Sequence, residues 1–183
     1  LEGARQGNEL LAANAILLQL VAISAYFLDG YAFAAEAFVG EAFGSRDRRR
    51  FDAAARLSTF WAFATSLVVS VLFWFQGPNF IALMTVNLEV RAVSTTYLGW
   101  AAALPVLSVW CYQLDGIFIG AVRTVDMRNT AIASLALFFG SFWLLTPYGN
   151  HGLWAALALF NVGRALALGL YYPRLRRSVP SAA

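Results

Sequence analysis

Charged side chains are scarce in this chain. Of its 183 residues, 13% are charged, whereas a typical soluble domain carries about a quarter. Lysine is absent, and all thirteen basic residues are arginines. The shortage of charge argues against an ordinary soluble domain, because so few charged side chains could not cover a surface that faces water.

Cysteine and histidine occur once each, as Cys111 and His151. A single cysteine cannot form an intramolecular disulfide, so Cys111 is interpreted as a small buried hydrophobic residue. His151 lies in a polar turn with no second metal ligand nearby. The sequence also shows no phosphate-binding loop, no Ser-His-Asp set and no zinc motif. We therefore predict neither enzymatic activity nor a bound cofactor or metal.

Long apolar segments are what the chain has in abundance. Hydrophobic residues make up 60% of it, and the mean hydropathy is +0.64. A helix needs ~20 apolar residues to cross a ~30 Å hydrocarbon core. Within lipid the backbone must satisfy its own hydrogen bonds, which favours helices. The sequence predicts an all-α, polytopic transmembrane bundle of about five spanning helices, at residues 10–44, 51–76, 90–122, 129–146 and 152–173.

The segment boundaries carry three further expectations. Gln76-Gly77-Pro78-Asn79 is typical of a turn and is expected to end the second helix. The tail 174–183 is basic and then rich in Pro, Ser and Ala, so it is expected to be disordered. An odd number of spans and the lack of an initiating Met suggest that the beginning of the protein is missing.

The arginines are distributed unevenly along the chain. Positive charge gathers in the cytoplasmic loops of membrane proteins, so this asymmetry predicts an outer N-terminus and a cytoplasmic C-terminus. The net charge of +3 is thus interpreted as a topology signal, and nucleic acid is not an expected partner. Ten arginines follow the first, third and fifth segments: Arg46, Arg48, Arg49, Arg50, Arg56, Arg123, Arg128, Arg174, Arg176 and Arg177.

Carboxylates inside apolar helices are the best candidates for function. Each costs ~3 kcal/mol or more at the bilayer centre, so such residues face a cavity or a partner. On the first helix, Asn14, Asp29 and Glu36 fall within an arc of ~60°. On the third helix, Ser108 and Asp115 share a face. We predict an aqueous cavity between the helices, with the three carboxylates as proton, cation or substrate sites and the other two residues beside them.

A structural interpretation of the same residues remains open. Asp29 and Asp115 each precede a glycine and could cap a bend in their helix, or they could pair with Arg123 or Arg164. Arg164 itself could neutralise a carboxylate across the bundle. The interpretation that we favour for Arg164 is that its side chain extends to the cytoplasmic interface.

Two stretches resemble a known family: Leu11–Gln19 followed by Tyr26–Gly40, and Leu114–Thr124 followed by Asp126–Asn129. With this spacing the chain resembles the DNA-damage-inducible F branch of the multidrug and toxic compound extrusion (MATE) transporters. The resemblance implies twelve helices in two six-helix lobes. The five segments would be the eighth to twelfth helices, part of the C-terminal lobe, and Leu1–Gly7 would be the outer end of the seventh. The absent N-terminal lobe would then be this chain's partner.

The resemblance also implies an activity. Such proteins are antiporters that expel small organic, often cationic, compounds in exchange for H⁺ or Na⁺, here across a bacterial inner membrane. The best-known coupling carboxylate of this branch lies in the absent lobe, so its role cannot be carried over to Asp29, Glu36 or Asp115. Two alternatives remain: a flippase for lipid-linked sugars with the same architecture, and a standalone membrane subunit without transport activity.

Overall fold

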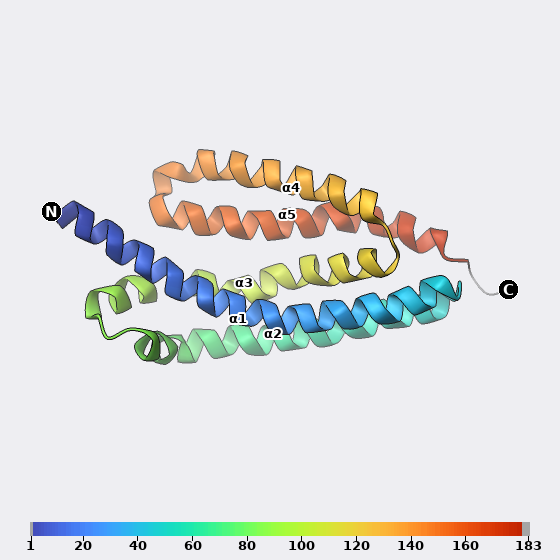
Figure 1. Cartoon of the computed structure of the whole chain (residues 1–183), viewed down its shortest axis with the longest axis horizontal. Coiled ribbons are helices and arrows are strands. Elements are labelled where there is room, and N and C mark those ends of the chain that lie inside the picture. The colour runs from blue at the N-terminus through green and yellow to red at the C-terminus, as the bar shows by residue number, and fades with distance from the viewer. Residues whose placement is uncertain (1, 181–183) are drawn as a thin grey trace.

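The computed structural model describes the backbone of residues 2–180 and the side chains of residues 7–180. Within this range it contains helices and no strand, which confirms the predicted all-α class. Five long helices follow one another with short connections (Figure 1). They are α1 (Glu2–Gly44), α2 (Arg48–Met84), α3 (Leu88–Gly120), α4 (Thr124–Leu145) and α5 (Gly149–Ser178), with the short helix η1 (Thr146–Tyr148) between the last two.

Four stretches of the described chain are long and apolar enough to cross a membrane. The last of them, Thr124–Ser178, folds back on itself at η1 and so contains both α4 and α5. Large apolar side chains such as Phe33 and Trp143 are 67% and 80% exposed. Such exposure would be costly in water but is favourable against lipid. The prediction of a polytopic membrane bundle is therefore confirmed.

Helix α3 lies at the centre of the bundle. It packs against α1 and α2 on one side and against α5 on the other, and the α4–α5 hairpin forms an outer layer (Figure 1). In its most hydrophobic window 56% of the residues are buried, against 22% in each of the other stretches. Many side chains of α3 therefore face the other helices rather than the surroundings.

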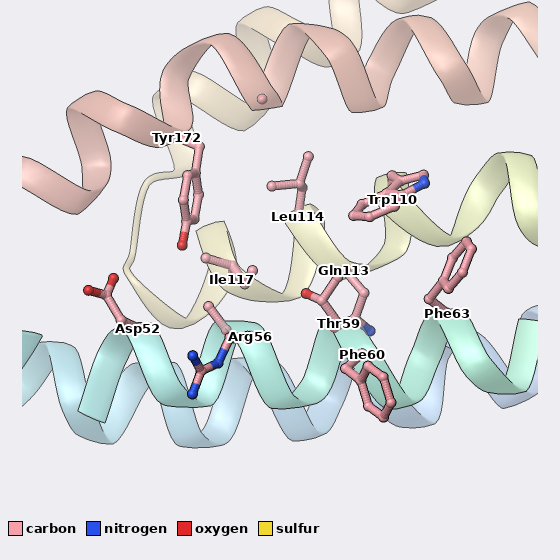
Figure 2. Close-up of a pocket in the computed structure, with 12 residues that line it drawn as sticks. Asp52, Arg56, Thr59, Phe60, Phe63, Trp110, Gln113, Leu114, Ile117 and Tyr172 are labelled. Atoms are coloured by element: carbon pink, nitrogen blue, oxygen red, sulfur yellow. The ribbon is translucent and has the colours of Figure 1, made fainter. Parts of the chain in front are cut away.

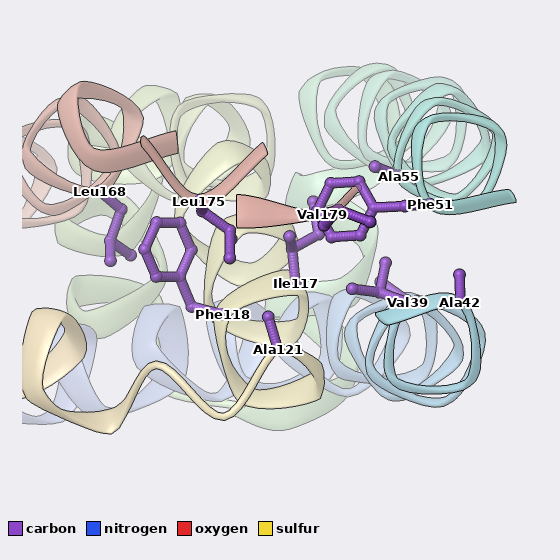
Figure 3. Packing of buried hydrophobic residues seen from close by; sticks show 11 residues of the cluster. Val39, Ala42, Phe51, Ala55, Ile117, Phe118, Ala121, Leu168, Leu175 and Val179 are labelled. Carbon is purple, nitrogen blue, oxygen red and sulfur yellow. The ribbon is translucent and has the colours of Figure 1, made fainter. Parts of the chain in front are cut away.

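Two large groups of buried side chains hold the helices together at opposite ends of the bundle. The first lies at the arginine-rich end and joins α1, α2, α3 and α5 (Figure 3). It contains Val39, Phe51, Phe118 and Leu168, each fully shielded from solvent. The second, around Trp154, packs the opposite ends of α1, α2, α3 and α5 together. Burial of apolar area at both ends fixes the relative positions of the helices between them.

The turns after α1 and α3 share one geometry. Arg46 and Val122 have positive φ values of 57° and 55°, a conformation that is uncommon for residues other than glycine. In both turns the following amide donates to a carbonyl five residues earlier: Asp47 to Ala42 and Arg123 to Phe118. Gly44 and Gly120 are the last helical residues before these two turns.

The predicted turn at Gln76-Gly77-Pro78-Asn79 is wrong. Helix α2 continues through Pro78 to Met84, and it changes direction towards this end (Figure 1). Proline removes one helical hydrogen bond and bends a helix rather than always ending it, particularly where neighbouring helices support the backbone. Gly77 provides that support, because it packs directly against the side chain of Leu98 on α3.

The expectations for both termini also need correction. Residues 2–7 form the first part of α1 rather than the end of a separate preceding helix, whereas Leu1 lies outside the described residues. At the other end α5 remains helical to Ser178. Arg176 forms a bidentate pair with Asp52 on α2, at 2.7 and 2.6 Å, and Val179 is buried. The tail is therefore ordered at least that far, and residues 181–183 lie outside the described part.

Candidate functional site

A cavity of about 280 Å³ brings the three predicted carboxylates together. Asp29 and Glu36 enter it from α1, Asp115 from α3 and Arg164 from α5, with Met127 of α4 at its edge. We call it the carboxylate cavity. The sequence pattern therefore identified three residues that share one space, although they lie on helices far apart in the chain.

Close contact between α1 and α3 creates this arrangement. Gly116 and Gly120, one turn apart on α3, lie against the backbone of Ala32, Glu36 and Gly40 on α1. A Cβ atom at Gly116 would lie 2.3 Å from the carbonyl oxygen of Ala32, and one at Gly120 would lie 2.5 Å from that of Glu36. Small residues at this spacing let two membrane helices approach closely. Asp115 is carried to α1 because it immediately precedes this contact.

Asp115 forms an ion pair with Arg164. The Nη2 atom donates to Oδ1 at 2.9 Å, and Nε donates to Oδ2 at 3.1 Å. The two side chains are 25% and 17% exposed respectively. The structural interpretation that these residues pair is therefore confirmed for Asp115. The favoured interpretation of Arg164, extension to the cytoplasmic interface, is wrong, because a carboxylate across the bundle offers a stronger partner than lipid headgroups.

Asp29 and Glu36 differ from Asp115. Both are half-buried, and neither forms an ion pair or hydrogen bond with the described residues. Helix α1 continues without a break through Gly30, so Asp29 lies within a helix rather than at its end. Three carboxylates and one guanidinium leave an excess of two negative charges when every carboxyl is ionised. The cavity is therefore suited to attract a proton or another cation.

The carboxylates are not assembled into a metal-binding cluster. Across the described residues no three His, Cys, Asp or Glu side chains are close enough to hold a metal ion together. Besides Arg164, Asp115 contacts Cys111, a buried residue whose Sγ lies 3.7 Å from Oδ2. The thiol thus supports the position of the carboxylate from one turn earlier on the same helix.

Ser108 and Asn14, the other two predicted cavity residues, lie elsewhere. Ser108 is buried within α3, and its hydroxyl donates to the carbonyl of Leu104 at 2.7 Å. This bond satisfies the buried hydroxyl within its own helix. Neither Ser108 nor Asn14 lines the carboxylate cavity. Helical periodicity groups residues by face, but it cannot show which helix lies opposite each residue along the length of the bundle.

Asn14 instead joins α1 to the beginning of α5. Its amide and that of Asn150 donate to each other, at 2.7 and 3.0 Å, and the indole Nε1 of Trp154 donates to the same Asn14 oxygen at 3.0 Å. Trp154 is almost fully buried. The Asn14 amide therefore supplies the acceptor for the indole N–H of an almost fully buried side chain.

We expect Asn14→Leu to lower the free energy of unfolding by about 1–3 kcal/mol, because a buried indole donor loses its acceptor. Thermal unfolding of the full-length protein in detergent measures the effect. Gln19→Leu is the matched control, since Gln19 is an exposed amide on the same helix. Equal melting temperatures for the two variants would show that the contact contributes nothing to stability.

Gly116 and Gly120 are residues of the site region whose packing role the sequence did not reveal. They form a Gly-x-x-x-Gly pattern within an apolar helix, which is a recognised signal for close helix packing in membranes. The pattern was visible in the sequence, but it could not identify α1 as the facing helix. Tyr112, which also lines the carboxylate cavity, carried no comparable signal.

Comparison with known proteins gives one family match and several relatives. The MatE family model matches residues 3–146. DNA damage-inducible protein F of Escherichia coli is 40% identical over 172 residues, which cover 94% of this chain and 38% of that protein. Protein DETOXIFICATION 42 of Arabidopsis thaliana is 28% identical, covering 92% of this chain and 33% of that protein.

A third relative shows the same partial coverage. The probable multidrug resistance protein NorM of Pseudomonas aeruginosa is 26% identical over an alignment that covers 96% of this chain and 38% of that protein. The chain thus spans between 33% and 38% of the length of these curated relatives.

Proposed function

This chain belongs to the MatE family, and we propose that it forms part of a secondary active antiporter that exports organic, often cationic, compounds in exchange for H⁺ or Na⁺. Names of two relatives support the export of foreign compounds, since they refer to multidrug resistance and to detoxification. The partial coverage of every relative supports a chain that acts together with a further lobe.

The single observation that carries the proposal is the grouping of Asp29, Glu36 and Asp115 around one cavity with one arginine. Arg164 neutralises Asp115 and leaves the two carboxylates of α1 available. A flippase for lipid-linked sugars would have to bind a pyrophosphate group, and an acidic cavity repels such a substrate. The charge of the cavity therefore favours proton or cation coupling.

The carboxylate cavity also lies between helices, where binding of an ion could change how the helices pack. Its walls come from α1, α3 and α5, with Met127 of α4 at the edge, so a cation bound there contacts all three main helices at once. Binding of one H⁺ or Na⁺ would halve the excess negative charge and reduce the repulsion between the two unpaired carboxylates of α1. A difference in affinity between two arrangements of these helices is what couples ion binding to movement.

The placement in the cell follows from the same proposal. The protein would lie in a bacterial inner membrane with the arginine-rich end of the bundle in the cytoplasm. The arginines after α1, α3 and α5 support this orientation. The C-terminal end of α5 would then also be cytoplasmic.

Resistance assays on the full-length protein test the proposal. We expect Asp29→Asn and Glu36→Gln to lower drug resistance more than they lower the amount of protein in the membrane, because the cavity can then no longer bind and release a cation. Glu41→Gln is the matched control. Glu41 lies on the same helix, is exposed, and contacts Arg50 at 3.5 Å outside the cavity.

Transport by purified protein in vesicles, driven in turn by a proton gradient and by a sodium gradient, identifies the coupling ion. Normal resistance in a variant with Asp29, Glu36 and Asp115 all neutralised would overturn the role of the cavity.

A further inference from the structure

A second, larger opening lies on another side of α3. It has a volume of about 530 Å³, is bounded by α2, α3 and α5, and shares no residue with the carboxylate cavity. We call it the lateral crevice. Residues from all three helices line it, including Arg56, Phe60, Trp110, Gln113 and Tyr172 (Figure 2).

Gln113 is the unusual residue of the lateral crevice. Its side chain is 1% exposed, and neither Oε1 nor Nε2 has a hydrogen-bond partner. A buried amide without hydrogen-bond partners is unfavourable, because it has lost its bonds to water and gained none in return. The side chain extends from α3 towards α2, beside Thr59 (Figure 2). A molecule that entered the crevice and offered a hydrogen-bonding group would remove this cost.

Charge is also unbalanced at one end of the lateral crevice. Asp52 is already bound by Arg176. Arg56 is exposed and forms no ion pair with the described residues. This end therefore presents positive charge above a mainly apolar opening.

The spacing of these groups matches one class of molecule. Arg56 and Thr59 are three residues apart on α2, about 4.5 Å along the axis, and Gln113 lies beside Thr59. Beyond them the walls are aromatic and apolar, with Phe60, Phe63 and Trp110. A phospholipid has the same order: an anionic phosphate, then ester carbonyls, then hydrocarbon.

We propose that the lateral crevice binds an anionic phospholipid from the surrounding membrane. Its phosphate lies at Arg56, an ester carbonyl accepts a hydrogen bond from Nε2 of Gln113, and one acyl chain lies against Phe60 and Trp110. Basic openings between membrane helices hold acidic headgroups in this way. The site is independent of transport and of the carboxylate cavity, so its test does not depend on the proposed function.

Native mass spectrometry of the full-length protein tests the proposal, after equilibration with equal amounts of phosphatidylglycerol and phosphatidylcholine. We expect the unaltered protein to retain one phosphatidylglycerol molecule. In Arg56→Gln the affinity for this lipid should be about tenfold lower, because a charge-assisted hydrogen bond is lost. Gln113→Leu should reduce retention as well. Arg49→Gln, an exposed arginine of the same helix outside the crevice, should behave as the unaltered protein.

Equal retention by the unaltered protein and Arg56→Gln, or equal retention of phosphatidylcholine, would overturn the proposal. A photo-crosslinking amino acid at position 60 provides a second measurement in native membranes. The expected product is a phospholipid adduct, seen as an increase in intact mass. A crosslink to another segment of the same protein would also overturn the proposal, because that segment would then fill the crevice.

Discussion

Gly116→Ala is expected to force α1 and α3 apart and to lower the free energy of unfolding by about 3 kcal/mol, at the upper end of the range for overpacking. The new Cβ would lie 2.3 Å from a backbone oxygen of Ala32. Side chains can rotate away from such a contact, but a helix backbone cannot, so the whole helix must shift. The loss is measured as a lower melting temperature of the full-length protein in detergent.

Gly140→Ala is the control for this experiment. Gly140 lies within α4, and a Cβ there would meet nothing within 4 Å. Because alanine favours helices over glycine by ~1 kcal/mol, this variant should be as stable as the unaltered protein or slightly more so. If Gly116→Ala and Gly140→Ala melt alike, the close contact of α1 and α3 does not determine stability. Gly120→Ala should resemble Gly116→Ala, since its Cβ would lie 2.5 Å from the oxygen of Glu36.

Arg164→Leu should destabilise the protein by a similar amount, about 2–3 kcal/mol. Removing one partner of a fully buried ion pair costs about 3–5 kcal/mol, because the other charge is left uncompensated. The pair here is partly exposed, with side chains 17% and 25% accessible, so a smaller loss is expected. Thermal unfolding at neutral pH gives the value.

A charge exchange separates the ion pair from other roles of Arg164. In the double variant Asp115→Arg with Arg164→Asp, the two charges are again opposite, so part of the lost stability should return. Each single exchange places like charges together and should be the least stable. A double variant no more stable than the single exchanges would show that the pair itself contributes little.

Several parts of the fold could be predicted from the chain because they depend on local chemistry. Apolar runs of membrane-spanning length require helices whatever their neighbours are. The turn predicted around Pro78 is wrong because a proline can either end a helix or only bend it. The packing of Gly77 against Leu98 on α3, which the sequence does not show, favours a bent but continuous helix. The tail was misjudged for a similar reason, since the contact of Arg176 with Asp52 links residues 124 positions apart.

The candidate site was predicted in part. Asp29, Glu36 and Asp115 were selected because ionisable groups are costly in hydrocarbon, and that cost follows from the sequence alone. Asn14 was placed with them by helical periodicity, yet it bonds to Asn150 and Trp154. Periodicity assigns residues to a face, but a helix of 43 residues has different neighbours along its length.

The sequence by itself determined that this protein is a bundle of membrane helices with charges at one end and carboxylates inside. The physical reason is that lipid imposes its requirements on each segment separately. The tertiary structure alone decided that Arg164 neutralises Asp115, that Asp29 and Glu36 have no such partner, and that Gln113 lies unpaired in a crevice. Those facts depend on which residues of neighbouring helices lie opposite one another. Close packing of small residues such as Gly116 against α1 fixes that alignment.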